Sequence, residues 1–154
     1  MKIKWKKLLI CIAVPLGVGG LSALISGNAM ASFENVIKPP LTPPGWLFPV
    51  AWTVLYILMG LASYSVTESD DPTKKSALIF YGVQLGINFF WSLIFFNLSA
   101  YLFAFIWILA LWVTILVTML KFYRLNERAG NLLFPYIVWV TFAAYLNYGV
   151  YLLN

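Results

Sequence analysis

Long uncharged stretches dominate the hydropathy pattern of this chain. Four such runs cover residues 8–33, 39–67, 76–120 and 129–154. A helix needs about 20 apolar residues to cross a hydrocarbon core, so each run is long enough to span a bilayer. The third run is more than twice that length, and a short polar interruption at residues 97–99 predicts a turn within it. The pattern predicts an all-α bundle of five transmembrane helices, at roughly 8–27, 46–66, 77–97, 100–120 and 132–153.

The composition agrees with an integral membrane protein. Of 154 residues, 62% are hydrophobic and only 10% are charged, and the mean hydropathy is +0.88. Soluble domains carry about 25% charged residues. A soluble chain of this length has too little interior to hide so much apolar surface. We therefore expect one transmembrane domain over residues 1–154, with almost no structured mass outside the lipid bilayer.

The few charges predict an orientation. If successive helices alternate in direction, one face receives nine of the ten basic residues, namely Lys2, Lys4, Lys6, Lys7, Lys74, Lys75, Lys121, Arg124 and Arg128. Only Lys38 falls on the other face. The positive-inside rule then places the N-terminus in the cytoplasm and the C-terminus outside. The net charge of +5 follows from this topology, so no nucleic-acid partner is expected. The acidic residues Glu68, Asp70 and Asp71 are expected simply to solvate a loop.

The beginning of the chain also has features of a secretory signal. A lysine-rich start precedes an apolar run, and Ala29-Met30-Ala31 matches a small-residue cleavage site. The apolar stretch is longer than the roughly 7–15 residues of a typical signal core, which favours an uncleaved first span. The single cysteine, Cys11, lies inside that span and excludes an intrachain disulfide.

Several kinds of chemistry lack their usual residues. The sequence has no histidine, no Cys-x-x-Cys motif, no phosphate-binding glycine loop and no charged residue inside a predicted span. Metal sites, proton relays and ion-coupled pumps usually need such groups. We expect no metal and no cofactor. A ligand would be held by stacking, apolar contact and a few neutral hydrogen bonds.

The predicted third span has two different faces. At about 100° per residue, Gly82 and Gly86 fall on one side, and Gln84, Asn88 and Trp91 on the other. The glycines form a small-xxx-small pattern, which permits close helix packing within the chain or across a homodimer interface. Amides are costly in hydrocarbon unless they are bonded, so Gln84 and Asn88 should face the interior. There they make structural bonds or contact a ligand.

Aromatic stripes on two other spans can complete a pocket. The last span carries a stripe of Pro135, Trp139, Ala143, Leu146 and Val150, with Asn147 at its edge, and the second span carries a stripe of Phe48, Trp52, Tyr56 and Met59. Both tryptophans lie nearly two turns inside their predicted helices, deeper than the interfacial aromatic belt. The stripes either pack the core or bind a ligand. The small Ala143 beside Trp139 leaves room for a flat guest.

The loop before the second span is rich in proline. Residues 28–45 contain four prolines at 39, 40, 43 and 44. Because proline fixes φ and removes a hydrogen-bond donor, this loop should be stiff and non-helical. It either covers the outer mouth of the bundle or is an ordinary loop between helices with a proline-led helix start.

Motifs between residues 43 and 148 match one family in their order and spacing. They are Pro43-Pro44-Gly45-Trp46, Trp52-Thr53-Val54-Leu55-Tyr56, Met59-Gly60, Gln84 with Asn88 and Trp91, Phe134-Pro135-Tyr136 with Trp139, Phe142-Ala143, and Leu146-Asn147-Tyr148. In these motifs the chain resembles the translocator protein family, whose members are also called tryptophan-rich sensory proteins or peripheral benzodiazepine receptors. Its short length makes it similar to bacterial members.

The resemblance implies a dimeric five-helix bundle whose pocket opens beneath the first loop. Members of that family bind porphyrins and synthetic isoquinoline or benzodiazepine ligands. Carried over by position, and with Gln84 added from the polar face, the implied ligand-binding residues are Phe33, Trp52, Gln84, Asn88, Trp139, Ala143, Leu146 and Asn147. A metal-free porphyrin needs no axial ligand, which agrees with a sequence that lacks histidine.

The resemblance also implies light-dependent oxidative degradation of protoporphyrin, with Trp52 and Trp139 as the catalytic pair. The alternative is a tetrapyrrole carrier or stress sensor that performs no chemistry of its own. In animal members, a stretch matching residues 146–152 ends in a basic residue and is proposed to recognise cholesterol. Leu152 occupies that basic position here, so cholesterol transport is not expected.

Overall fold

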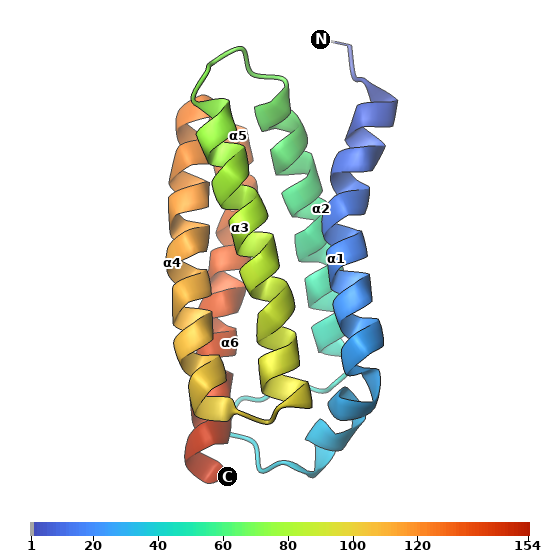
Figure 1. Cartoon of the computed structure of the whole chain (residues 1–154), viewed down its shortest axis with the longest axis vertical. Helices are drawn as coiled ribbons and strands as arrows, with labels where there is room; N and C mark the ends of the chain where they lie inside the picture. The colour runs from blue at the N-terminus through green and yellow to red at the C-terminus, as the bar shows by residue number, and fades with distance from the viewer. Residues whose placement is uncertain (1) are drawn as a thin grey trace.

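Successive spanning segments run in opposite directions along a common axis (Figure 1). The computed structural model describes residues 2–154, without the side chains of residues 28–30 and 32. All regular structure within that part is helical. The elements are α1 (Trp5–Ser32), the 3-10 turn η1 (Phe33–Asn35), α2 (Leu47–Thr67), α3 (Lys74–Ser92), the π-helical segment η2 (Leu93–Asn97), α4 (Tyr101–Leu125), α5 (Glu127–Leu132) and α6 (Phe134–Leu153).

Five segments of the described chain are long and apolar enough to cross a membrane. They are Trp5–Gly27, Leu47–Thr67, Lys74–Asn97, Tyr101–Leu125 and Glu127–Leu153. The predicted all-α bundle of five spanning helices is therefore confirmed. Residues 28–32 were expected in a non-helical loop but belong to α1. Two boundaries differ by five residues: the fourth span ends at Leu125 and not at 120, and the fifth begins at Glu127 and not at 132, because α5 precedes α6.

An N-cap explains this earlier start. The Asn126 side chain accepts hydrogen bonds from the backbone N–H groups of Arg128 (2.9 Å) and Ala129 (3.3 Å). This cap, with Glu127 in the first turn, stabilises the start of α5. As a result, Trp139 lies close to the middle of the fifth span, deeper than the sequence predicted.

Glycine permits close approach at several positions, of which Gly60 and Gly149 are two. A Cβ atom on Gly60 would lie 2.5 Å from the Ile12 Cα, so α1 and α2 contact each other through their backbones there. A Cβ on Gly149 would lie 2.5 Å from the ring of Pro39, where the first loop rests on α6. The predicted close-packing pair behaves differently: a Cβ on Gly82 or Gly86 would meet nothing within 4 Å. Tight packing of these two glycines within the described chain is therefore excluded.

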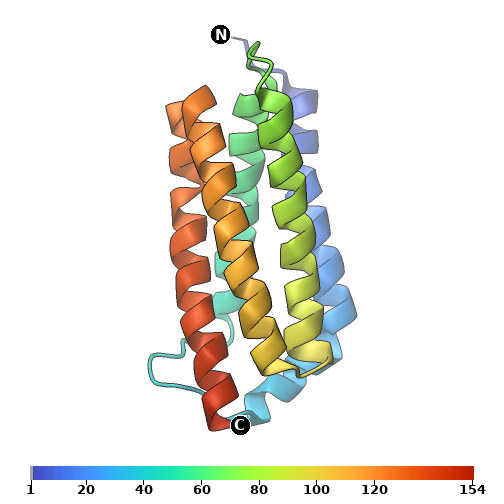
Figure 2. The same cartoon turned by 60° about the vertical axis from the view of Figure 1, so that its left-hand side comes forward.

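The proline-rich loop is bound to the last helix. The Asn154 amide pairs with the backbone of Ile37, donating to its oxygen at 2.8 Å and accepting from its nitrogen at 3.1 Å. The Tyr145 hydroxyl donates to the oxygen of Pro40 at 2.8 Å. Leu41 has a φ of 70°, in the left-handed region that a leucine rarely adopts. The turned view in Figure 2 shows this loop folded outward beside α6.

One acidic residue does more than solvate its loop. Glu68 follows α2, and its carboxylate lies 2.6 Å from the Lys7 ammonium and 3.3 Å from that of Lys4. Its side chain is only 11% exposed. The expectation that Glu68 merely solvates the loop was therefore wrong, because the carboxylate ties the start of α1 to the end of α2.

Candidate functional site

The two predicted tryptophans meet inside the bundle. Trp52 on α2 and Trp139 on α6 have ring centroids 6.4 Å apart and planes nearly perpendicular, at 89°. Tyr56 stacks on Trp52 at 5.7 Å, and Phe48 packs edge-on against Trp139 at 5.9 Å. Edge-to-face and offset arrangements are those that aromatic rings prefer. The helical repeat brings Phe48, Trp52 and Tyr56 onto the same face of α2, since they are four residues apart.

A chain of hydrogen bonds lies beside this aromatic cluster. The Tyr136 hydroxyl donates to Gln84 Oε1 at 2.6 Å and accepts from Asn88 Nδ2 at 2.8 Å. The Tyr56 hydroxyl in turn donates to Asn88 Oδ1 at 3.4 Å. Gln84 and Asn88 are 1% and 4% exposed, which confirms that the polar face of the third span points inward. These bonds connect α3 with both aromatic helices and satisfy the amides where no water competes.

Asn147 belongs to a neighbouring polar pair. Its Oδ1 accepts from the Trp91 indole N–H at 3.0 Å, and its Nδ2 donates to the backbone oxygen of Tyr101 at 2.9 Å. Asn147 thus joins α6 to α3 and α4. Leu146 and Ala143 are buried on the same helix. The structure therefore uses both sides of the Asn147 amide for packing.

One polar atom in the aromatic cluster has no partner. The indole nitrogen Nε1 of Trp139 is buried and donates to no atom of the described chain. Buried donors are almost always paired, so an orphaned one marks a place where a ligand acceptor would be favoured. By contrast, the indole N–H groups of three other tryptophans, Trp91, Trp107 and Trp112, donate to acceptors on neighbouring helices.

Phe33 is placed elsewhere. It begins η1 and packs against Phe95 and Phe96, with ring centroids at 5.5 and 5.6 Å. The Lys38 ammonium lies 5.0 Å above its ring. The structure therefore brings Phe33 into a second aromatic cluster beside η2, and shows no ring contact between it and the tryptophan pair among the described residues.

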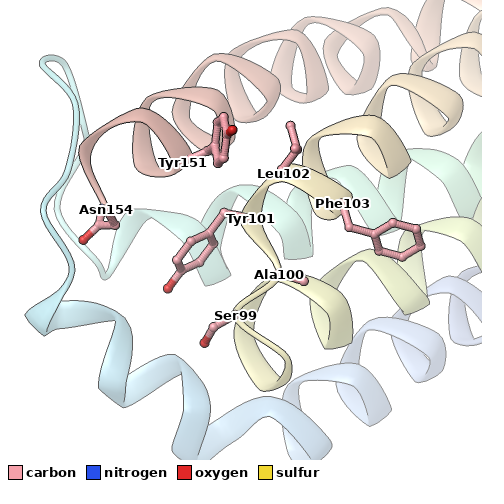
Figure 3. A pocket seen from close by; sticks show the side chains of 7 residues that line it. All are labelled: Ser99, Ala100, Tyr101, Leu102, Phe103, Tyr151 and Asn154. Carbon is pink, nitrogen blue, oxygen red and sulfur yellow. The ribbon is translucent and has the colours of Figure 1, made fainter.

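An open hollow of about 450 Å³ lies at the end of the bundle that carries the C-terminus (Figure 3). Ser99, Ala100, Tyr101, Leu102 and Phe103 line it from the start of α4, facing Tyr151 and Asn154 at the end of α6. None of the predicted ligand-binding residues lines this hollow. It is therefore a separate surface feature.

The sequence prediction omitted Tyr136 from the site. This tyrosine is 1% exposed, touches Trp52 edge-on at 6.2 Å and lies at the centre of the hydrogen-bond chain. The available signal was its spacing: Tyr136, Val140, Ala143 and Asn147 recur at helical intervals and are all buried. The stripe proposed from the sequence began instead at Pro135, which is exposed.

The cluster contains no ionisable acid or base other than tyrosine, and no group of three histidine, cysteine, aspartate or glutamate residues that could hold a metal occurs in the described part. Stacking surfaces, neutral amides and oxidisable indoles are what the site offers. The fold and site together define a multi-pass membrane protein with an aromatic and amide-lined core between α2, α3 and α6.

Comparison with known proteins agrees with this class. The TspO/MBR family model matches residues 11–153. The chain is 37% identical over 150 residues to the "Tryptophan-rich protein TspO" of Chlorobaculum tepidum, covering 96% of this chain and 95% of that protein. It is 34% identical over 154 residues to the "Tryptophan-rich sensory protein" of Cereibacter sphaeroides, covering 100% and 95%. It is 29% identical over 143 residues to the "Translocator protein" of Homo sapiens, covering 91% and 85%. The chain belongs to the TspO/MBR family.

Proposed function

We propose that this chain binds tetrapyrroles, protoporphyrin in particular, and flat isoquinoline or benzodiazepine ligands in the aromatic core, and that it promotes light-dependent oxidative degradation of the bound porphyrin. The observation that carries the proposal is the contact between Trp52 and Trp139 at 6.4 Å, with the Trp139 indole N–H buried and unpaired. The names of the relatives, which include a sensory protein and translocator proteins, support a receptor or sensor in the membrane.

Stacking supplies most of the expected affinity. An aromatic pair is worth about 0.5–1.5 kcal/mol beyond its buried area, and a macrocycle can face several rings at once. The free Trp139 N–H would favour a ligand that places a carbonyl or carboxylate oxygen against it. A metal-free tetrapyrrole suits a chain without histidine, because it requires no axial ligand.

Entry of a large flat guest requires the rings to separate. Trp52 contacts both Tyr136 and Trp139 in the described structure. The first loop is held to α6 by the side chains of Asn154 and Tyr145. Each such hydrogen bond contributes only about 0.5–1.5 kcal/mol, so the binding free energy of a tightly stacking ligand can offset displacement of the loop.

The proposed reaction is an oxidation of the excited pigment in contact with an indole. Dissolved dioxygen is the oxidant. The site holds no acid or base that could drive hydrolysis, and indole is far easier to oxidise than phenyl. In the proposed step an indole of Trp52 or Trp139 gives one electron to the excited porphyrin, which passes it to dioxygen and forms superoxide. The oxidised indole then regains an electron from the porphyrin, and the resulting porphyrin radical combines with superoxide, so that both oxygen atoms of dioxygen enter the product.

Substitution of each tryptophan by phenylalanine tests the proposal. Trp52→Phe and Trp139→Phe should bind protoporphyrin within about tenfold of the parent, equivalent to about 1.4 kcal/mol. Both should degrade it slowly or not at all under light. Porphyrin fluorescence titration measures binding, and timed illumination with and without oxygen measures degradation. Trp5→Phe is the matched control, because Trp5 is 66% exposed and lies at the start of α1.

A carrier or sensor without chemistry is the second candidate. It is favoured by the internal pairing of Gln84, Asn88 and Asn147, which makes these amides packing groups. If both site variants and the control degrade porphyrin at the parental rate, Trp52 and Trp139 only line the site and take no part in the reaction. Saturable binding with no product in the parent would support the carrier or sensor.

A further inference from the structure

The positive charge of the molecule is concentrated at one end. The N-terminus, the α2–α3 loop and the α4–α5 junction meet there (Figure 1). These segments contain nine basic and four acidic residues, a surplus of five positive charges. At the opposite end, Lys38 and Glu34 balance each other. The entire net charge of the chain therefore lies at one end of the bundle.

Most of the described basic side chains at this end form no ion pair with a local carboxylate. Glu68 pairs with Lys4 and Lys7. Asp71 instead accepts from the backbone N–H and hydroxyl of Thr73, at 2.8 and 2.7 Å. Among the described residues, no carboxylate lies within salt-bridge distance of the basic residues that remain, which are Lys2, Lys6, Lys74, Lys75, Lys121, Arg124 and Arg128.

Lys121 is the best-placed of these cations. Its side chain, near the end of α4, is half-buried against α3, where the ammonium donates to the Ser76 hydroxyl at 3.0 Å and lies 5.1 Å above the Phe80 ring. Lys75 lies next to Ser76 in the first turn of α3, where the helix dipole makes a cation unfavourable. An anion bonded to the Ser76 hydroxyl would lie within reach of the Lys121 ammonium, and Lys75 is the residue that precedes Ser76 on the same turn.

The surface below these residues is apolar. Ile79 and Val83 follow Lys75 by one and two turns of α3, and they are 56% and 48% exposed. A ligand seated at Lys121 would therefore have hydrocarbon-facing surface directly beneath it. This combination of cations above and aliphatic side chains below matches the structure of a phospholipid.

We propose that Lys121, Lys75 and Ser76 form a binding site for the phosphate of an anionic phospholipid, whose acyl chain lies along Val83, on the side of α3 that is turned from the Gly82 and Gly86 face toward Ser76. Basic sites between transmembrane helices bind anionic headgroups through charge-assisted hydrogen bonds. The site requires only that the basic end lies at a membrane interface. It is independent of the proposed porphyrin site, because it uses the outer surface of α3 and α4.

Native mass spectrometry of the detergent-solubilised chain tests the site. With phosphatidylglycerol and phosphatidylcholine as probes, the parent should retain phosphatidylglycerol preferentially. Lys121→Gln should weaken phosphatidylglycerol binding about fivefold, the equivalent of about 1 kcal/mol per basic residue near a membrane surface. Lys75→Gln should weaken it in the same direction. Equal retention of the two lipids by the parent would overturn the proposal.

Lys38→Gln provides a matched control. Lys38 also lies over a phenylalanine ring, at 5.0 Å, but at the neutral end of the molecule. Its substitution should leave phosphatidylglycerol binding unchanged, and an effect equal to that of Lys121→Gln would refute a local site. Inorganic phosphate should not compete at matched concentration, since it has no acyl chain. Displacement by phosphate would replace the lipid with a free anion and overturn the proposal. Because Lys121→Gln also removes the hydrogen bond to Ser76, binding of all variants should be compared at a temperature below every unfolding midpoint.

Discussion

The hydroxyl of Tyr136 should contribute measurably to the stability of the bundle. In Tyr136→Phe, the ring is kept but two buried bonds are lost, the 2.6 Å bond to Gln84 and the 2.8 Å bond from Asn88. Interhelical hydrogen bonds in membranes contribute about 0.6 kcal/mol each on average, and at most about 1.7. Leaving a buried polar group unsatisfied costs about 1–3 kcal/mol. We expect a loss of about 1–3 kcal/mol in the free energy of unfolding.

Equilibrium unfolding in mixed detergent and dodecyl sulfate measures this loss. Tyr148→Phe is the control, because Tyr148 is 43% exposed and its hydroxyl bonds to no atom of the described chain. Its stability should match that of the parent. In the double variant Gln84→Leu/Tyr136→Phe, the loss should be smaller than the sum of the single losses, since both substitutions remove the same bond. If Tyr136→Phe is as stable as Tyr148→Phe, these bonds do not hold α3 to α6.

Three further predictions follow from the ends and the outer surface of the bundle. We propose a homodimer through the uncovered Gly82 and Gly86 face of α3. Gly82→Leu or Gly86→Leu should then shift the solubilised particle toward a monomer in mass measurements, and an unchanged mass would exclude this seam. A reporter fused after Asn154 should be accessible only from outside the cytoplasm, and cytoplasmic activity would show that the proposed orientation is wrong. The Lys7 ammonium, followed by Lys4, lowers the pKa of Glu68 below its ordinary value of 4.5. The stabilisation from this ion pair should be present at neutral pH and lost as the pH falls below 4.5 and through the lowered pKa. In Glu68→Gln this acid-dependent part of the unfolding profile should be absent, and a profile identical to the parent's would contradict the role of the pair.

Local sequence patterns were enough to predict most of the fold. Long apolar runs specify spanning helices because the bilayer allows only internally bonded backbone. The 3.6-residue repeat also placed Gln84, Asn88 and Trp91 on the buried face of α3, as the structure confirms. The start of α5 was missed, although Asn126 followed by Glu127 is an N-cap signal that the sequence contains.

Contacts between segments that are distant in the sequence were harder to predict. Helical periodicity says which side of a helix is apolar, but it does not say at what height two antiparallel helices meet. For this reason the sequence named Trp52 and Trp139 without predicting their 6.4 Å contact, and assigned Phe33 to the ligand site although it packs beside η2. The free indole N–H of Trp139 also became visible only in three dimensions.

The sequence by itself determined the membrane class, the number of spans and the buried polar face of α3, because these depend on composition and on a fixed helical repeat. Only the tertiary structure decided how polar groups are paired. Glu68 was expected to face solvent and instead joins Lys4 and Lys7, and Tyr136 was passed over although it connects Gln84 with Asn88. A hydrogen bond or ion pair depends on a few ångströms of separation between helices, and that separation is set by side-chain packing over the whole bundle.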